Sequence, residues 1–447
     1  MDRETVEPRV TDLPGERGRR VVDFHHERAA PSTYVYEFVW DHSAPAIGPF
    51  CTDVDGNVLL DFTCHVGAMP LGYNNPAILD RFSEFDIVDP TKIAGQDFYL
   101  PATGALDDAG IPGPADLMER LTGISEQYGM DTVFLSNSGA EAVENALKIC
   151  FDHTRGKYTI TCEGAFHGRT LGALSLNRSK EVYRRAYPEI ASVHDIPFCT
   201  DRTCTAESCE CGFFFDETSS LRRMIEGGGY VNPDEIAALI LEPIQGEGGY
   251  RFPSDAFAAE IAALTEEYDI PLIADEVQSG LGRTGEWWAS DGYAFEPDVI
   301  ASAKSARVGA TISSAEIFPE ETSRLSSTWG AGDILASAQG VFTIDAIESQ
   351  GLLDNATERG RQMQELLADA DPPGVVDIRG KGLMLAVEFE TADLRDAVQA
   401  AAFERGFLIL GCGKRTIRLL PPLDVTEREI RMGAELFVES AAAAVSQ

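Results

Sequence analysis

The middle of the chain alternates short apolar runs with amphipathic segments. The apolar runs, which predict strands, cover residues 131–136, 158–162, 237–242, 270–277 and 299–304. Segments with a helical spacing of apolar residues lie between or after them, for example at 140–153 and 256–268. Continuous apolar strands separated by amphipathic helices are typical of a mostly parallel sheet that is buried on both faces. The pattern therefore predicts a large α/β domain over residues 71–345.

The pattern changes after about residue 345. Helical spacing at about 354–370, 393–405 and 426–444 flanks short apolar runs near 382–388 and 416–420. This mixture predicts a smaller α+β domain over residues 346–447. Residues 1–70 carry a turn, Asp-Val-Asp-Gly-Asn, between extended runs, and we expect them to pack with the small domain.

Two of the predicted strands end in side chains that can do chemistry. Lys304 ends the run 298–304, and Asp275 ends the run 270–275, 29 residues earlier. In open α/β sheets, ligands bind at the carboxyl ends of the strands. Burial can lower the pKa of a lysine amine, and a neutral amine can attack an aldehyde. Lys304 and Asp275 could therefore hold one aromatic aldehyde cofactor; the alternative is a lysine that is merely exposed after a strand.

The segment after the first strand could bind a phosphate. The polar turn Asn-Ser-Gly-Ala at 137–140 opens a strongly helical segment. N–H groups and the positive end of the dipole at a helix start attract anions. Ser138 could add a hydroxyl donor, and Gly139 would let the backbone approach the anion. The alternative is an ordinary helix N-cap.

Two further strand ends carry candidate site residues. Phe166, after the second strand, offers a flat apolar face for ring stacking, and His167 follows it. The third strand leads into a glycine-rich loop at 242–249 that carries Glu242 and Glu247. The alternatives are core packing for Phe166 and a hydrogen-bonded structural role for His167.

The charge of the chain restricts its partners. The net charge is -37, and arginine outnumbers lysine 29 to 7. Such a negative field opposes binding to nucleic acid or to an anionic membrane. Acid-rich, lysine-poor surfaces resemble those of proteins from salt-loving archaea, so we expect a halophilic, acidic protein. The charged start and the lack of an apolar run of about 20 residues indicate a cytoplasmic protein with no membrane span.

Four of the nine cysteines lie close together in the sequence. Cys199, Cys204, Cys209 and Cys211 have the spacing C-x4-C-x4-C-x-C. Zinc sites usually contain paired C-x2-C motifs, and disulfides are rare in a reducing cytosol. We therefore interpret this segment as an insertion loop with free thiols and assign no metal ligands, although a bound metal stays open.

Taken together, the motifs resemble those of class III pyridoxal-phosphate-dependent aminotransferases of fold type I. The resemblance runs from about residue 53 to about 422. Any one motif is weak, but their order is specific: Asn-Ser-Gly-Ala-Glu-Ala at 137–142, Phe-His-Gly-Arg-Thr at 166–170, Glu-Pro-Ile-Gln-Gly-Glu-Gly-Gly at 242–249, Asp-Glu-Val-Gln-Ser-Gly at 275–280 and Ala-Lys at 303–304. The resemblance implies an α/β fold with a mostly parallel central sheet in a large domain and a smaller α+β domain.

The resemblance also implies roles around pyridoxal 5′-phosphate. Lys304 would form a Schiff base with the cofactor and, once freed, carry the proton. Asp275 would keep the pyridine nitrogen protonated, so that the ring accepts electron density. The other cofactor-binding residues would be Ser138, Gly139 and Ala140 at the phosphate, Phe166 and Val277 on the two ring faces, Gln278 near the phenolic oxygen, together with His167 and Glu242, and Thr328, which would reach the phosphate of the partner subunit in a homodimer.

Three residues would select the substrate. Arg418 matches an arginine that clamps an α-carboxylate, and Arg169 matches one that contacts a carboxylate in ornithine or γ-aminobutyrate enzymes. Glu247 matches a glutamate that pairs with the first arginine when no α-carboxylate is present. The trio favours transfer from lysine, ornithine, γ-aminobutyrate or another amine to 2-oxoglutarate or pyruvate by a ping-pong mechanism. Arg307 departs from the family, in which glycines often follow the lysine.

Two other functions stay open at this point. An amino-acid racemase or aminomutase would keep the same cofactor residues and return the proton elsewhere. The cysteine segment and residues 411–418 resemble archaeal aminotransferases and racemases, whereas residues 326–330 resemble the lysine ε-aminotransferase branch. A non-catalytic cofactor-binding protein is the other alternative, but it would tolerate loss of Lys304 or Asp275, and both are present.

Overall fold

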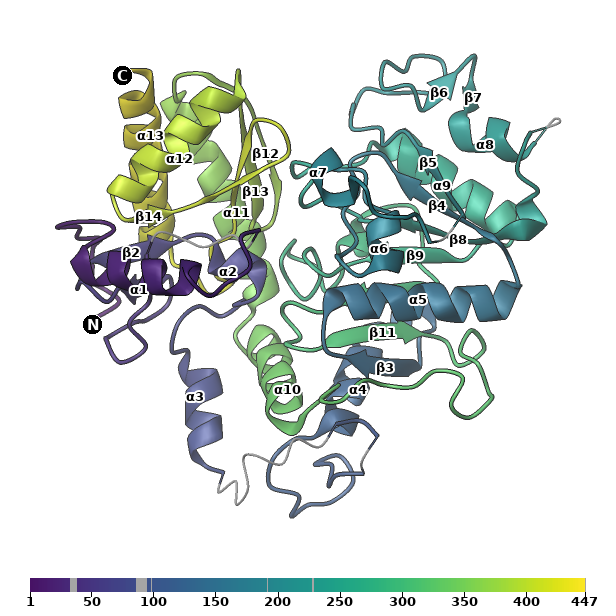
Figure 1. The fold of residues 1–447 in the computed structure, drawn as a ribbon, viewed down its shortest axis with the longest axis horizontal. Coiled ribbons are helices and arrows are strands. Elements are labelled where there is room, and N and C mark those ends of the chain that lie inside the picture. Colours follow the sequence, from purple (N-terminus) through teal and green to yellow (C-terminus); the bar gives the residue numbers. More distant parts are fainter. Residues whose placement is uncertain (33–37, 86–94, 98, 191, 227–228, 447) are drawn as a thin grey trace. The chain divides into compact units, whose positions relative to one another are not determined.

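The computed structural model describes the chain except residues 33–37, 86–94, 98, 191, 227–228 and 447 (Figure 1). It contains two compact units. One comprises Met1–Asp80 together with Gln350–Gln447, and the other comprises Arg81–Ser349. The predicted site residues lie in the second unit, with the exception of Arg418.

The second unit is built on a sheet whose strand order is β3-β11-β10-β9-β8-β4-β5. All neighbouring pairs are parallel except the two that involve β11, which confirms the predicted mostly parallel sheet. Its strands are β3 (Thr132–Ser136), β4 (Tyr158–Cys162), β5 (Ser192–Ile196), β8 (Ile236–Leu241), β9 (Leu272–Asp275), β10 (Val299–Ser302) and β11 (Gly309–Ser313), with the hairpin β6 (Phe214–Phe215) and β7 (Thr218–Ser219) outside the sheet. The helices are α4 (Pro114–Gly123), α5 (Gly139–Thr154), α6 (Leu171–Ser175), α7 (Glu181–Arg184), α8 (Ser220–Ile225), α9 (Asp255–Glu267) and α10 (Ile334–Ser349).

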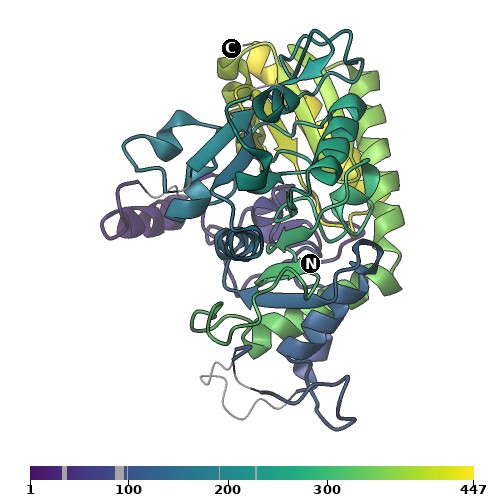
Figure 2. The same ribbon diagram turned by 90° about the vertical axis from the view of Figure 1, so that its right-hand side faces the viewer.

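Both faces of this sheet are buried because alternate side chains of its central strands point to opposite sides. Leu239 and Leu241 of β8 belong to a core cluster with residues of α9, whereas Ala238 and Ile240 belong to a cluster with residues of α5. α5 lies along the sheet in contact with β8, β10 and β11 (Figures 1 and 2). The continuous apolar runs in the sequence are the consequence of this two-sided burial.

The first unit combines two smaller sheets with a group of helices. An antiparallel sheet has the order β12-β13-β16-β15, and another has the order β1-β2-β14. β2 pairs in parallel with β14, so the N-terminal and C-terminal segments share a sheet. The strands are β1 (Phe50–Thr52), β2 (Val58–Asp61), β12 (Val375–Lys381), β13 (Met384–Phe389), β14 (Phe407–Leu408), β15 (Leu410–Cys412) and β16 (Thr416–Leu419).

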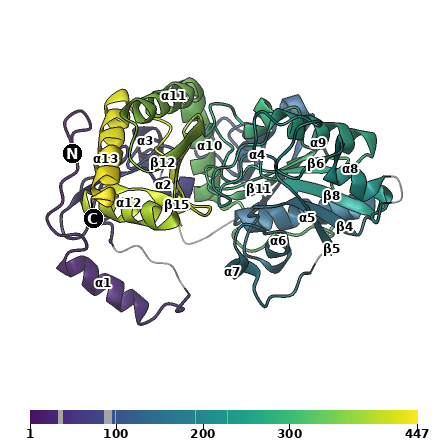
Figure 3. The same ribbon diagram turned by 90° about the horizontal axis from the view of Figure 1, so that it is seen from above.

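The long C-terminal helices of the first unit pack against one another (Figure 3). The helices are α1 (Glu16–His26), α2 (Cys64–Gly67), α11 (Leu352–Ala370), α12 (Ala392–Glu404) and α13 (Glu427–Val445), while α3 (Pro76–Ser83) spans the division between the units. No helix in the described part of the chain is long and apolar enough to cross a membrane.

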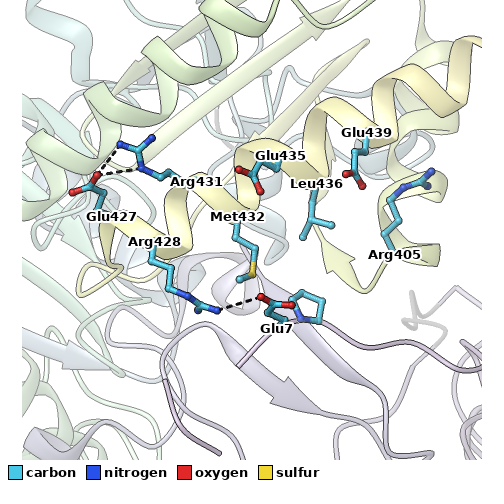
Figure 4. A pocket seen from close by; sticks show the side chains of 10 residues that line it. Glu7, Arg405, Glu427, Arg428, Arg431, Met432, Glu435, Leu436 and Glu439 are labelled. Atoms are coloured by element: carbon cyan, nitrogen blue, oxygen red, sulfur yellow. Dashed lines mark hydrogen bonds and ion pairs between the residues drawn. The ribbon is translucent and has the colours of Figure 1, made fainter. Parts of the chain in front are cut away.

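A charged groove runs along α13 (Figure 4). Arginine, glutamate and apolar side chains line it, and Nη2 of Arg431 donates a hydrogen bond to Oε1 of Glu427 at 2.8 Å. Arg428 approaches Glu7 at 3.9 Å. The predicted site residues do not line this groove, and all of them except Arg418 lie in the second unit instead.

Candidate active site

Lys304 and Asp275 follow neighbouring parallel strands. Asp275, the last residue of β9, is aligned with Ala301 of β10, and the N–H of Glu276 donates to the Ala301 carbonyl at 2.9 Å. Lys304 lies three residues beyond Ala301, half-buried in the short connection that leads into β11. The sheet register therefore brings Lys304 and Asp275 to the same edge of the sheet, which we call the cofactor edge.

Asp275 is buried and held in one orientation. Nδ1 of His167 lies 2.8 Å from Oδ2, so that an N–H at Nδ1 donates to the carboxylate, and the N–H of Val277 donates to Oδ1 at 3.1 Å. The His167 side chain is fully buried, and the Asp275 side chain is 5% exposed. The histidine therefore supports the carboxylate that the cofactor nitrogen would face.

Asn177 in turn supports His167. Its Oδ1 accepts a hydrogen bond from the His167 N–H at 2.6 Å, and its Nδ2 donates to the Gly168 carbonyl at 2.8 Å. Sequence reasoning missed Asn177, because it lies ten residues downstream in a segment without a recognisable motif.

The predicted phosphate seat lies at the start of α5. Ser138 is its N-cap, and its hydroxyl accepts from the N–H of Glu141 at 3.2 Å. A Cβ at Gly139 would lie 2.8 Å from Cγ1 of Val277, so a larger residue would displace the segment after β9. Ala140 follows in the first turn of the helix. The backbone N–H groups of a first turn have no carbonyl partner within the helix and can donate to an anion. The helix start and Val277 are thus adjacent, as a phosphorylated ring would require.

Thr328 lies beside this seat in its own chain. Its Oγ1 accepts a hydrogen bond from Nδ2 of Asn137 at 2.6 Å and donates to Oε1 of Glu141 at 3.0 Å. The side chain is exposed. Its contact with a partner subunit stays a prediction.

Glu242 joins two loops of the cofactor edge. Its Oε1 accepts from the N–H of Phe166 at 2.9 Å, and its Oε2 accepts from the N–H of Gly246 at 2.8 Å. Burial, together with the negative charge of Asp275, raises the pKa of Glu242 to about 8. The proximity of the two carboxyl groups therefore favours the neutral form of Glu242 at this edge.

Gln278 and His167 offer buried polar atoms to a ligand. Among the described residues, Oε1 of Gln278 and Nε2 of His167 have no hydrogen-bond partner. A Cβ at Gly246 would lie 3.0 Å from that Gln278 oxygen, so the glycine leaves room for the amide. Buried polar atoms normally have partners, so a bound molecule is a reasonable source of one here.

These groups fit pyridoxal 5′-phosphate. The start of α5 suits its phosphate, the Phe166 and Val277 side chains suit its ring, and the supported Asp275 carboxylate suits its ring nitrogen. Lys304 is the amine at the same edge that would hold its aldehyde carbon.

Arg169 and Glu247, the predicted substrate residues of the second unit, lie in a looser group with two residues that were not predicted, Lys180 and Tyr183; we call these four residues the substrate cluster. Oε2 of Glu247 lies 3.9 Å from Nζ of Lys180. Lys180 also approaches the ring of Tyr183 at 5.8 Å, and that ring contacts Phe166 edge-on at 5.3 Å. Arg169 is exposed, with its guanidinium 6.0 Å from the Phe166 ring centre. Sequence reasoning missed Lys180 and Tyr183, although the scarcity of lysine was a signal.

Arg418 belongs to the first unit. It is buried in β16, aligned with Ala386 of β13 and Leu410 of β15. Its predicted pairing with Glu247 stays a prediction. Arg307, which departs from the family pattern, is exposed after Lys304 with a left-handed φ of 68°.

Comparisons with known proteins agree with this geometry. A family model described as "Aminotransferase class-III" matches residues 43–440. The acetylornithine aminotransferase of Archaeoglobus fulgidus is 33% identical over 397 residues, covering 88% of this chain and 93% of the relative. The alanine/serine racemase of Pyrococcus horikoshii is 31% identical, covering 87% and 83%. Among solved structures, the lysine aminotransferase from M. tuberculosis has a TM-score of 0.80 at 28% identity, covering 95% and 99%. The chain therefore belongs to the class III aminotransferases, enzymes of fold type I that depend on pyridoxal 5′-phosphate.

Proposed function

We propose that this enzyme transfers an amino group from an ω-amino acid or amine to a keto acid in two half-reactions. The donor would be of the lysine, ornithine, γ-aminobutyrate or putrescine type, and the acceptor would be 2-oxoglutarate or pyruvate. The His167–Asp275 pair carries the proposal, because it holds an oriented carboxyl group at the sheet edge to which the register also brings Lys304.

The cofactor, when bound, supplies an aldehyde that takes up the amino group and a ring that accepts electron density. The chain's own residues do the rest. Asp275 holds a proton on the ring nitrogen, and His167 keeps its carboxylate oriented. Nζ of Lys304 would accept a proton from the donor carbon, as a general base, and would then donate it to the cofactor carbon, as a general acid.

The donor class rests on charge at the substrate cluster and on relatives. Glu247 can pair with a cation while an ω-amine reacts, and it must release that cation when a keto acid brings a carboxylate. Lys180 is one such cation at 3.9 Å, and Arg418 would be another. Curated relatives include a putrescine aminotransferase at 31% identity and 4-aminobutyrate aminotransferases at 30–31%.

A half-reaction panel tests this proposal. The holoenzyme is mixed separately with lysine, ornithine, γ-aminobutyrate, putrescine and alanine, and the loss of cofactor absorbance is followed. We expect at least one ω-amine to react faster than alanine. A fast reaction with alanine alone would contradict the ω-donor assignment.

An amino-acid racemase is the second candidate, favoured by the 31% identity to the alanine/serine racemase. Incubating one enantiomer without a keto acid separates the two functions. Racemisation without net transfer of the amino group would support the racemase.

We also infer a homodimer in which Thr328 reaches the partner's site, in a cytoplasm with high salt. The net charge of -37 supports the salt requirement, because screening shortens repulsion to roughly 3 Å at 1 M salt. Light scattering across a salt series checks both inferences; a monomer at high salt, or full stability at low salt, would contradict them.

A further inference from the structure

The four clustered cysteines meet in space in spite of their irregular spacing. They lie between β5 and α8, and their Sγ atoms all lie within 4.8 Å of one another. Cys199 and Cys204 are buried, whereas Cys209 and Cys211 are partly buried. Local turns bring them together: the Thr203 N–H and hydroxyl both donate to Oδ1 of Asp201, and Thr205 and Ser208 exchange backbone hydrogen bonds.

The separations of the sulfur atoms bracket those of a tetrahedral metal site. Zn–S bonds of about 2.3 Å place the sulfur atoms of a tetrahedron about 3.8 Å apart. A disulfide needs an S–S distance of about 2.05 Å, whereas Sγ of Cys209 and Sγ of Cys211 are 3.1 Å apart. All four cysteines are free thiols. A set of four sulfur ligands in this geometry selects zinc or iron over harder cations.

The surroundings support thiolates. The Phe214 N–H donates to Sγ of Cys209 at 3.4 Å, the kind of outer hydrogen bond that orients a metal ligand. One divalent cation among the four sulfur atoms would stabilise all four thiolates.

We propose that Cys199, Cys204, Cys209 and Cys211 bind one zinc ion. Four protein ligands fill a tetrahedral site and leave no open position, so the role of the zinc is structural. The ion ties the segment after β5 to the core, where Phe198 and Phe213 pack against Phe257 of α9.

The site also adjoins the loop that carries Glu242 and Glu247. The Phe198 carbonyl, one residue before Cys199, accepts from Nη2 of Arg251 at 2.9 Å. Nη1 of the same arginine donates to Oε1 of Gln245 at 3.0 Å. Zinc thus supports the backbone beside the active-site loop without touching the reaction.

The test measures metal and thiols in the intact holoenzyme, prepared under reducing conditions from a zinc-containing medium. We expect about one zinc ion per chain by elemental analysis. A mercurial thiol reagent should release it as the four cluster thiols react. After denaturation with a chelator, all nine cysteines should be titratable.

A double variant and a matched control locate the metal. Cys209→Ser/Cys211→Ser should lose zinc to below about a tenth of an ion per chain. Cys150→Ala, which removes a buried cysteine of α5 outside the cluster, should keep the full amount. If the double variant does not fold, release of zinc from the wild-type enzyme in step with four thiols still decides the question.

Several results would overturn the proposal. Wild-type enzyme that holds no zinc and takes none up after reduction would leave a cluster of free thiols. Seven titratable thiols without metal would indicate a disulfide. Iron in place of zinc, with visible charge-transfer absorbance that survives removal of the pyridoxal cofactor, would overturn the zinc assignment.

Discussion

The cofactor edge and the substrate cluster lie in the same unit but are built differently. At the cofactor edge, the side chains of His167 and Asp275 are buried, and Nδ1 of His167 lies 2.8 Å from Oδ2 of Asp275. In the substrate cluster, Nζ of Lys180 lies 3.9 Å from Oε2 of Glu247. The Lys180 side chain is 38% exposed and the Glu247 side chain is 17% exposed. Buried, short contacts hold one arrangement, whereas long, solvated contacts are easily exchanged. The cofactor edge is therefore suited to hold one cofactor in a fixed position. The substrate cluster is suited to change its ion pairs as two different substrates bind in turn.

The largest expected effect comes from removing the amine of the cofactor edge. Lys304→Ala should reduce turnover on the order of 10³-fold or more, because it removes both the cofactor attachment and the general base. The visible absorbance of the bound cofactor should also shift. Steady-state kinetics and an absorbance spectrum check this, with Lys157→Ala, an exposed lysine paired with Glu235, as the control. Near-normal turnover would remove Lys304 from the mechanism.

The buried carboxyl of the cofactor edge should make stability depend on pH. Because the folded-state pKa of Glu242 is raised to about 8, its stabilising contribution is complete below its unfolded-state pKa of about 4.5. That contribution is lost progressively as the pH rises from about 4.5 to about 8. Glu242→Gln stays neutral, so its unfolding free energy should rise relative to that of the wild type over this pH range and then run parallel to it above about pH 8.

The expected relative gain in unfolding free energy is on the order of a few kcal/mol, because a tenfold change in proton affinity between the folded and unfolded states corresponds to about 1.4 kcal/mol. Chemical unfolding of the cofactor-free proteins at constant salt measures it. Parallel stability curves for the two proteins would mean that Glu242 is ionised in the folded state.

A smaller effect is expected from the support of Asp275. His167→Ala should lower kcat and cofactor affinity about 10- to 100-fold, since a hydrogen bond to a buried charge contributes about 1.5–3 kcal/mol. Reconstitution of the cofactor-free enzyme, followed by absorbance, gives the affinity. His194→Ala, a partly buried histidine of β5, is the matched control. If both variants reconstitute equally well, His167 has only a packing role.

The difference between the two regions also explains what the sequence predicts. The apolar runs identify β4, β8, β9 and β10, because burial on both faces leaves a continuous apolar signal. β11 was missed, since Gly-Ala-Thr-Ile-Ser is short and mixed in polarity. Motif order identifies the residues of the cofactor edge, because their spacing along the chain is set by the strands they follow.

Contacts between distant segments are beyond such reasoning. His167 and Asp275 are 108 residues apart, and only the sheet order brings them together. The cysteine segment shows the same limit: its spacing predicts free thiols, whereas its turns gather four sulfur atoms. Lys180 lies in no motif, and its approach to Glu247 depends on two loops.

The smallest expected effect tests whether the substrate cluster is as exchangeable as its distances indicate. Lys180→Met removes one cation near Glu247 and should change KM less than about fivefold, because partly exposed ion pairs contribute at most about 1 kcal/mol. Glu247→Ala should slow the ω-amine half-reaction more than the keto-acid half-reaction, since only the first needs a carboxylate to mask a cation. Single-turnover measurements of each half-reaction separate the two. Equal losses in both halves for Glu247→Ala would mean that Glu247 only shapes its loop, and a large loss for Lys180→Met would make the cluster as fixed as the cofactor edge.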